Sequence, residues 1–66
     1  MSVFAEQLKT LRKKNSLTQK ELAEKVGVKQ NSYANWENGN REPNIEMLVR
    51  IADYFDVSLD YLLGEK

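Results

Sequence analysis

A chain of 66 residues with neither cysteine nor histidine forms at most one small domain, without disulfides or the usual ligands of a zinc site. The missing histidine removes the commonest general base, and neither a glycine-rich phosphate loop nor a metal-ligand cluster occurs, so we expect no enzyme, no metal and no cofactor. The formal net charge is zero, but it is unevenly distributed: positions 1–41 hold eight basic and four acidic residues, and positions 42–66 hold two basic and six acidic ones.

The first predicted helix covers residues 3–14, with Ser2 as its N-terminal cap. Phe4, Leu8 and Leu11 recur at the i, i+4, i+7 spacing that buries one stripe of a helix. The polar residues that follow end this helix.

The second and third predicted helices, residues 18–26 and 29–37, are separated by a tight turn. Thr18 and Glu21 have the spacing of a capping box, in which each side chain satisfies a backbone N–H at a helix start. Gly27 follows, where a residue without Cβ can adopt a left-handed conformation without steric cost. Two short helices joined by a glycine-containing turn are the signature of a helix-turn-helix.

Two further helices are predicted after a polar loop that contains Gly39 and Pro43. The fourth covers residues 45–55 behind the N-cap Asn44, and the fifth covers residues 59–63. The expected buried stripe of the fourth helix is Ile45, Leu48, Ile51, Ala52 and Phe55. These elements predict an all-α fold, a compact five-helix domain spanning the whole chain.

One face of the third helix carries amide side chains. Gln30, Asn31 and Asn35 fall within a sector of about 140°, with Ser32 beside them. Glutamine and asparagine can bond N6 and N7 of adenine in the major groove, which would favour A·T-rich half-sites. Taken alone, the same residues also fit a surface helix that carries amides for solubility, with a serine that bonds only its own backbone.

Three segments, LTQKELAEKVGV, NWENGNREPNIEML and DVSLDYLLG, occur in the order and spacing of a known family. They resemble the DNA-binding domain of Cro and lambda-type phage repressors, the Xre-type helix-turn-helix family, over about residues 4–64. The resemblance implies a five-helix domain that binds operator DNA as a two-fold dimer. It also implies that bases are read by the amide face, at Gln30, Asn31, Ser32 and Asn35.

The resemblance implies roles for residues outside the reading face as well. Contacts with the DNA backbone are expected from Gln19, Asn38, Asn40 and Arg41. The alternatives are an ordinary polar residue in a first helical turn for Gln19 and a polar surface turn for the other three. Arg12 is expected to pair with Glu37 and so to clamp the first helix to the third, although a solvent-facing arginine is the alternative. Dimer contacts are expected in the fifth helix, at Leu59, Tyr61 and Leu62, although core packing explains most of its apolar surface.

Two positions depart from the family pattern. Lys29 stands where a small N-cap residue is usual, and lysine cannot accept a backbone hydrogen bond. The helix therefore loses a cap worth about 1 kcal/mol unless Asn31 or Ser32 caps it later, or Lys29 serves instead as a contact with the DNA backbone. Tyr33 stands where the family has isoleucine or valine, and we expect its ring in the core and its hydroxyl at the edge. Trp36 is expected in the core or as half-buried support for it, with a stacking platform as the alternative.

The expected function is a sequence-specific DNA-binding transcriptional regulator, a repressor acting at an inverted-repeat operator. An antitoxin or a restriction-modification controller with the same fold is one alternative. The acidic second part of the chain and the zero net charge leave open another, a helical protein-interaction module without DNA affinity. No apolar run approaches the roughly 18–20 residues of a membrane span, and we expect no signal peptide before the domain. We therefore expect a cytoplasmic, bacterial or phage-encoded homodimer, at least on DNA, with no membrane or small-molecule partner.

Overall fold

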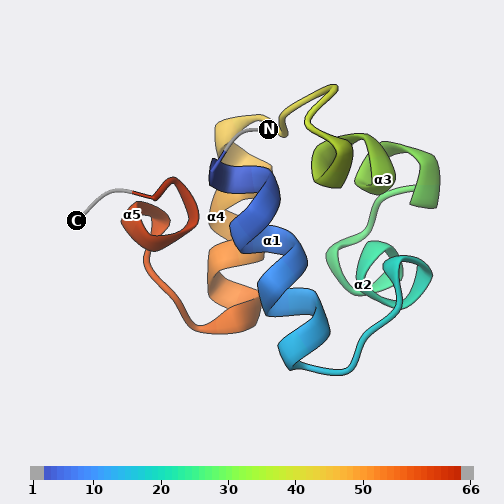
Figure 1. Ribbon diagram of the computed structural model, residues 1–66, viewed down its shortest axis with the longest axis horizontal. Coiled ribbons are helices and arrows are strands. Elements are labelled where there is room, and N and C mark those ends of the chain that lie inside the picture. The colour runs from blue at the N-terminus through green and yellow to red at the C-terminus, as the bar shows by residue number, and fades with distance from the viewer. Residues whose placement is uncertain (1–2, 65–66) are drawn as a thin grey trace.

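The computed structural model describes residues 3–64 and contains five α-helices in this range (Figure 1). They are α1 Val3–Lys14, α2 Gln19–Val26, α3 Gln30–Asn38, α4 Ile45–Phe55 and α5 Leu59–Leu62. The predicted all-α, five-helix fold is confirmed, and no helix end differs from its predicted position by more than one residue. The predicted cap Ser2 lies outside the described residues.

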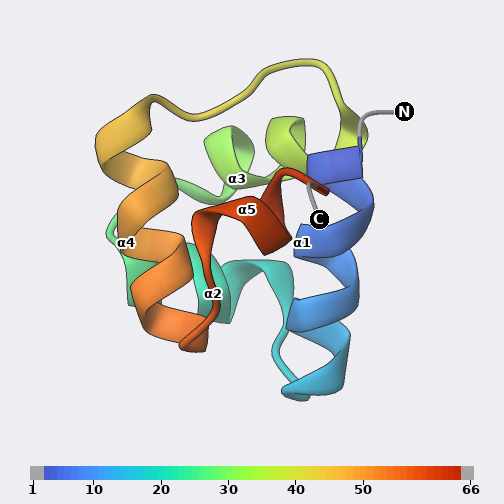
Figure 2. The same ribbon diagram turned by 90° about the vertical axis from the view of Figure 1, so that its left-hand side faces the viewer.

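The helices form two groups, α2 with α3 and α5 with α1 and α4, that meet at a common core. Helices α2 and α3 lie together on one side of the molecule, where α1 packs against α3 and α4 packs against α2 (Figure 1). Helix α5 lies against both α1 and α4, in front of them in Figure 2. The α2–α3 pair is therefore supported from the inside by α1 and α4, while its outer side faces solvent.

The core takes one apolar stripe from every helix. Phe4, Leu8 and Leu11 of α1 are all buried, as their spacing predicts. The other buried hydrophobic residues are Ala5, Leu22, Ala23, Val26, Tyr33, Trp36, Ile51, Ala52 and Leu62. Partly buried side chains from the connecting segments, Leu17, Val28 and Val57, pack against this cluster and anchor those segments to it.

Side-chain caps determine where three of the helices begin. Thr18 and Glu21 form both hydrogen bonds of the capping box at the start of α2, at 3.0 and 2.9 Å. Asn44 and Ser58 each accept a hydrogen bond from the backbone N–H three residues later, at the starts of α4 and α5. Each such cap stabilises its helix start by about 1 kcal/mol. Because the capping residues are recognisable in the sequence, these helix starts could be predicted.

The predicted stripe of α4 is wrong at its first residue. Ile45 is 71% exposed, whereas Ile51 and Ala52 are buried. Side chains of a helix point toward its N-terminus, so a residue in the first turn extends past the elements that cover the rest of the helix. Within residues 3–64, every helix is too short or too polar to span a lipid bilayer.

Candidate nucleic-acid interface

A tight turn joins α2 to α3 and holds the two helices in a fixed relation. Gly27 ends α2 in a left-handed conformation with φ 81°, which a side chain would strain. The N–H of Val28 donates to the carbonyl oxygen of Ala23 at 2.9 Å. From α4, Nη1 of Arg50 donates to the carbonyl oxygen of Val26 at 3.2 Å. The turn is thus stabilised both by its own backbone and by the neighbouring helix.

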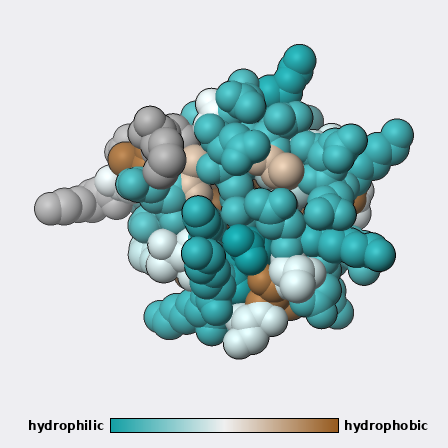
Figure 3. All heavy atoms as spheres, turned by 45° about the vertical axis from the view of Figure 1, so that its right-hand side comes forward, coloured by the Kyte–Doolittle hydropathy of each residue, from teal (hydrophilic) through white to brown (hydrophobic). Residues whose placement is uncertain are grey.

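Helix α3 has a buried face and a polar outer face. Tyr33 and Trp36 are buried and meet edge to face, with ring centroids 5.9 Å apart. Gln30, Asn31 and Ser32, three of the four predicted base-reading residues, are exposed. Asn35, the fourth, is half-buried. Figure 3 shows the side of the molecule on which α2 and α3 come forward, and its surface is predominantly hydrophilic with small apolar areas.

Lys29 is the N-cap of α3, and its side chain makes no capping hydrogen bond. The helix begins at Gln30, so neither Asn31 nor Ser32 caps it one turn later. The exposed ammonium of Lys29 lies at the start of the exposed amide face, where the positive end of the helix dipole adds to its charge.

The loop after α3 folds back on the last turn of that helix. Asn38 is the final helical residue, and Gly39 ends the helix with φ 78°. The N–H groups of Asn40 and Arg41 both donate to the carbonyl oxygen of Asn35, at 3.0 and 3.3 Å. The three residues predicted to contact the DNA backbone are all exposed: Asn38, Asn40 and Arg41.

A hollow of about 470 Å³ lies between α3, this loop and the start of α4. Ser32, Asn35 and Arg41 line it together with the apolar side chains of Val28 and Trp36. The fold therefore brings two predicted base-reading residues and one predicted phosphate contact to the same depression of the surface.

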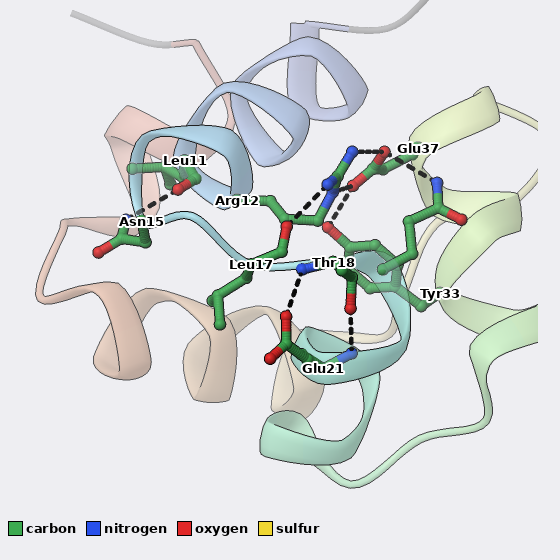
Figure 4. A network of polar contacts seen from close by, with 9 residues as sticks. Leu11, Arg12, Asn15, Leu17, Thr18, Glu21, Tyr33 and Glu37 are labelled. Atoms are coloured by element: carbon green, nitrogen blue, oxygen red, sulfur yellow. Dashed lines mark hydrogen bonds and ion pairs between the residues drawn. The ribbon is translucent and has the colours of Figure 1, made fainter.

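Arg12 and Glu37 form the ion pair that the family resemblance implies, and they lie at the centre of a larger network (Figure 4). Nε of Arg12 donates to Oε2 of Glu37 at 2.6 Å, and Nη2 donates to Oε1 at 3.2 Å. The third guanidinium bond joins Nη1 to the carbonyl oxygen of Leu17 at 2.9 Å. The pair links α1, α3 and the segment that leads into α2, with side-chain exposures of 12% for Arg12 and 3% for Glu37.

The expectation for Tyr33 is wrong in one respect. Its ring is in the core, but its hydroxyl is also buried and donates to Oε2 of Glu37 at 2.5 Å. The hydroxyl finds a carboxylate inside the protein and has no need of the solvent edge. Burial and this hydrogen bond raise the pKa of Tyr33 well above its ordinary value, so the phenol stays protonated.

The network also contains a predicted DNA contact. Nε2 of Gln19, the first residue of α2, donates to Oε1 of Glu37 at 3.1 Å, and Gln19 is half-buried. Burial disfavours the charged form of Glu37, but the hydrogen bonds from Arg12, Tyr33 and Gln19 together hold the pKa of Glu37 below its ordinary value. The carboxylate raises the pKa of Arg12 in return.

The three predicted dimer contacts in α5 differ in their exposure to solvent. Tyr61 is 40% exposed and Leu59 is half-buried, so both reach the surface. Leu62 is fully buried in the core, and its side chain is therefore not available to a second chain. The exposed neighbour Leu63, at 44%, adds apolar surface beside them.

A capped helix, a left-handed glycine turn and a second helix with a buried apolar face and an exposed polar face define a helix-turn-helix domain. The chain belongs to the Xre-type helix-turn-helix family of Cro and lambda-type phage repressors, because the profile of the helix-turn-helix family matches residues 8–62.

Individual relatives agree with this assignment. The chain is 46% identical over 61 residues to YqaE of Bacillus subtilis, an uncharacterised HTH-type transcriptional regulator, covering 92% of this chain and 53% of that protein. It is 39% identical over 59 residues to RstR, a transcriptional repressor of the cryptic phage CTXphi in Vibrio cholerae, covering 89% and 53%. The chain thus spans about half the length of these relatives. The P22 c2 repressor, whose structure was solved in complex with a synthetic operator, superposes with a TM-score of 0.89 at 32% identity and with full coverage of both chains.

Proposed function

We propose that this chain is a single sequence-specific DNA-binding domain that regulates transcription, as a repressor at an inverted-repeat operator. The observation that carries the proposal is the exposed row of Gln30, Asn31 and Ser32 on a helix whose opposite face is buried. A rigid helix with polar side chains on its outer face can enter the major groove and present them to base edges. The P22 c2 repressor chain that was solved with operator DNA is similar over the full length of that solved chain, and RstR is a repressor; both support the proposal.

In the proposed complex, the outer face of α3 reads sequence. Gln30 and Asn31 lie in the first turn, where recognition helices contact bases, and each can bond adenine in a bidentate manner. Ser32 and the half-buried Asn35 contact the groove from the side of the hollow. Each bidentate pair is worth about 1–3 kcal/mol of discrimination against a wrong base.

Contacts with the phosphate backbone would flank this face. Lys29 lies at one end of α3, and Asn38, Asn40 and Arg41 lie at the other. Gln19 begins α2, where a helix N-terminus attracts an anion. Contacts of this kind set the register of the protein on the duplex without reading sequence.

We further propose that two copies bind half-sites about 34 Å apart, as two-fold symmetry requires. The exposed Tyr61 and the half-buried Leu59 of α5 are the residues proposed to contact the second copy. The proposed place of action is the bacterial cytoplasm, where chromosomal and phage operators are located.

The test is to select tight binders from a random DNA duplex pool and then to titrate salt against the best sequence. Enrichment of an inverted repeat is the expected result. Gln30→Ala should relax the preference at one position per half-site, because only a base contact is lost. Arg41→Ala should weaken all sequences alike and reduce the slope of log K against log salt by about 0.9.

Lys14→Ala is the matched control for Arg41→Ala, since it removes an exposed charge at the far end of α1. It should change the salt slope less than Arg41→Ala does. If no sequence is enriched even at low salt, the proposal fails, and the reading helix is either vestigial or serves a protein partner.

A further inference from the structure

A carboxylate lies beneath the proposed phosphate contact Gln19, and it holds the amide of that residue. We propose that Glu37 and Tyr33 are positioning residues for DNA binding: Tyr33 locks the carboxylate of Glu37, and Glu37 orients the Gln19 amide toward a phosphate. This inference rests on the proposed function, because it concerns one of the contacts that the function requires.

Every acceptor position of the Glu37 carboxylate is used. A carboxylate offers about four lone-pair sites, two on each oxygen. Oε2 accepts from Nε of Arg12 and from the hydroxyl of Tyr33, and Oε1 accepts from Nη2 of Arg12 and from Nε2 of Gln19. The carboxylate therefore cannot turn about its terminal bond without breaking hydrogen bonds on both oxygens. Oε1 is held where Gln19 reaches it.

This arrangement decides which way the Gln19 amide points. An amide group has two N–H donors on one end and a carbonyl acceptor on the other. Because Glu37 takes one N–H, the donor end of the amide is fixed at the network and the second N–H remains for a phosphate at the start of α2. A glutamine without such a partner would have to be ordered on binding, which costs about two- to tenfold in affinity.

A substitution at Tyr33 can test the positioning of the Glu37 carboxylate without removing the ion pair between Arg12 and Glu37. Its hydroxyl makes one of the two bonds to Oε2, while its ring packs against Trp36. Tyr33→Phe keeps the ring in the core and leaves both bonds between Arg12 and Glu37 in place. The variant therefore loosens the carboxylate with little change to the core.

A double-mutant cycle on the selected operator tests the inference. Gln19→Ala should weaken binding about tenfold, the size of one hydrogen bond to a charged group. Tyr33→Phe should weaken binding about threefold in the wild-type background and by less than twofold in the Gln19→Ala background. A general loosening of the fold would weaken both backgrounds equally, and that result, or no effect in either, would overturn the inference. Circular dichroism at the assay temperature establishes that each variant is folded.

A second measurement needs neither a variant nor DNA. In the NMR spectrum of the free domain, the side-chain amide of Gln19 should show a high order parameter, and that of the exposed Gln30 a low one. Equal mobility of the two amides would also overturn the inference, even if Tyr33→Phe did not fold. Failure of the proposed function has a different signature: the wild-type domain binds no selected duplex, whatever the order of the Gln19 amide.

Discussion

Replacing Glu37 with alanine should cost this domain a large part of its stability. The side chain of Glu37 is 3% exposed and accepts hydrogen bonds from three residues. Without it, the guanidinium of Arg12, 12% exposed, becomes a nearly buried charge without a carboxylate, and the hydroxyl of Tyr33 loses its acceptor. Removing one partner of a buried pair costs about 3–5 kcal/mol. A 66-residue domain has a total stability of roughly 3–10 kcal/mol, so Glu37→Ala removes between a third and all of it.

Urea unfolding followed by circular dichroism measures this loss. For a slope of about 1 kcal/mol per molar urea, the midpoint should fall by about 3–5 M, or the variant should be unfolded in water. Glu24→Ala is the matched control, because Glu24 is an exposed carboxylate in α2 and its removal should change stability by less than about 0.5 kcal/mol. Equal and small losses for the two variants would show that the Glu37 pair contributes no more than a surface pair, and would refute the reasoning.

Three further predictions concern pH, capping and exposure. Burial opposes ionisation of Glu37, but the donors led by Arg12 hold its pKa below the ordinary 4.5, so the ionised carboxylate stabilises the fold at neutral pH. Urea midpoints should therefore fall as pH drops below about 4.5, and less steeply in Glu37→Gln. Lys29→Ser should add about 0.5–1 kcal/mol of stability by capping α3 while weakening DNA binding and its salt dependence; stronger binding would contradict the proposed phosphate contact. Ile45→Lys should leave the urea midpoint within about 0.5 M, and a larger fall would contradict the 71% exposure of that side chain.

The fold was predictable because the ends of its helices are set by interactions between residues close in sequence. Thr18 with Glu21, Asn44 and Ser58 each cap a helix through a side chain three residues from its partner, and Gly27 and Gly39 adopt the left-handed conformation that ends one. These interactions depend on neighbours in sequence, so sequence spacing reveals them. The burial of α4 depends on which elements cover it. That is a tertiary property, and it explains why the exposure of Ile45 was missed.

The candidate site likewise has features that the local sequence predicts and features that depend on tertiary contacts. The exposure of Gln30, Asn31 and Ser32 follows from the helical period, since Tyr33 and Trp36 occupy the opposite face. Other parts of the site require residues far apart in the chain to meet.

Tyr33 and Glu37 are an i, i+4 pair on α3, and this spacing was a usable signal that the hydroxyl could reach the carboxylate. The bond between Gln19 and Glu37 joins residues 18 positions apart on different helices, and no local rule predicts it. Only the packed structure shows that a proposed DNA contact and the buried ion pair share one carboxylate.

Because Glu37 serves both the ion pair and Gln19, it tolerates substitution less well than the outer residues of α3 do. Glu37 holds α1 to α3 through Arg12 and also holds Gln19, so a change there alters both the orientation of α3 and a proposed phosphate contact. The outer residues Gln30 and Asn31 have no such second role, because they project into solvent from a helix whose stability comes from its other face. Surface substitutions of this kind change stability by about 0.5 kcal/mol or less, yet each can shift base preference by about 1–3 kcal/mol. Under the proposed function, such a domain can therefore acquire a new operator sequence by changing its outer face while the network beneath keeps its structure.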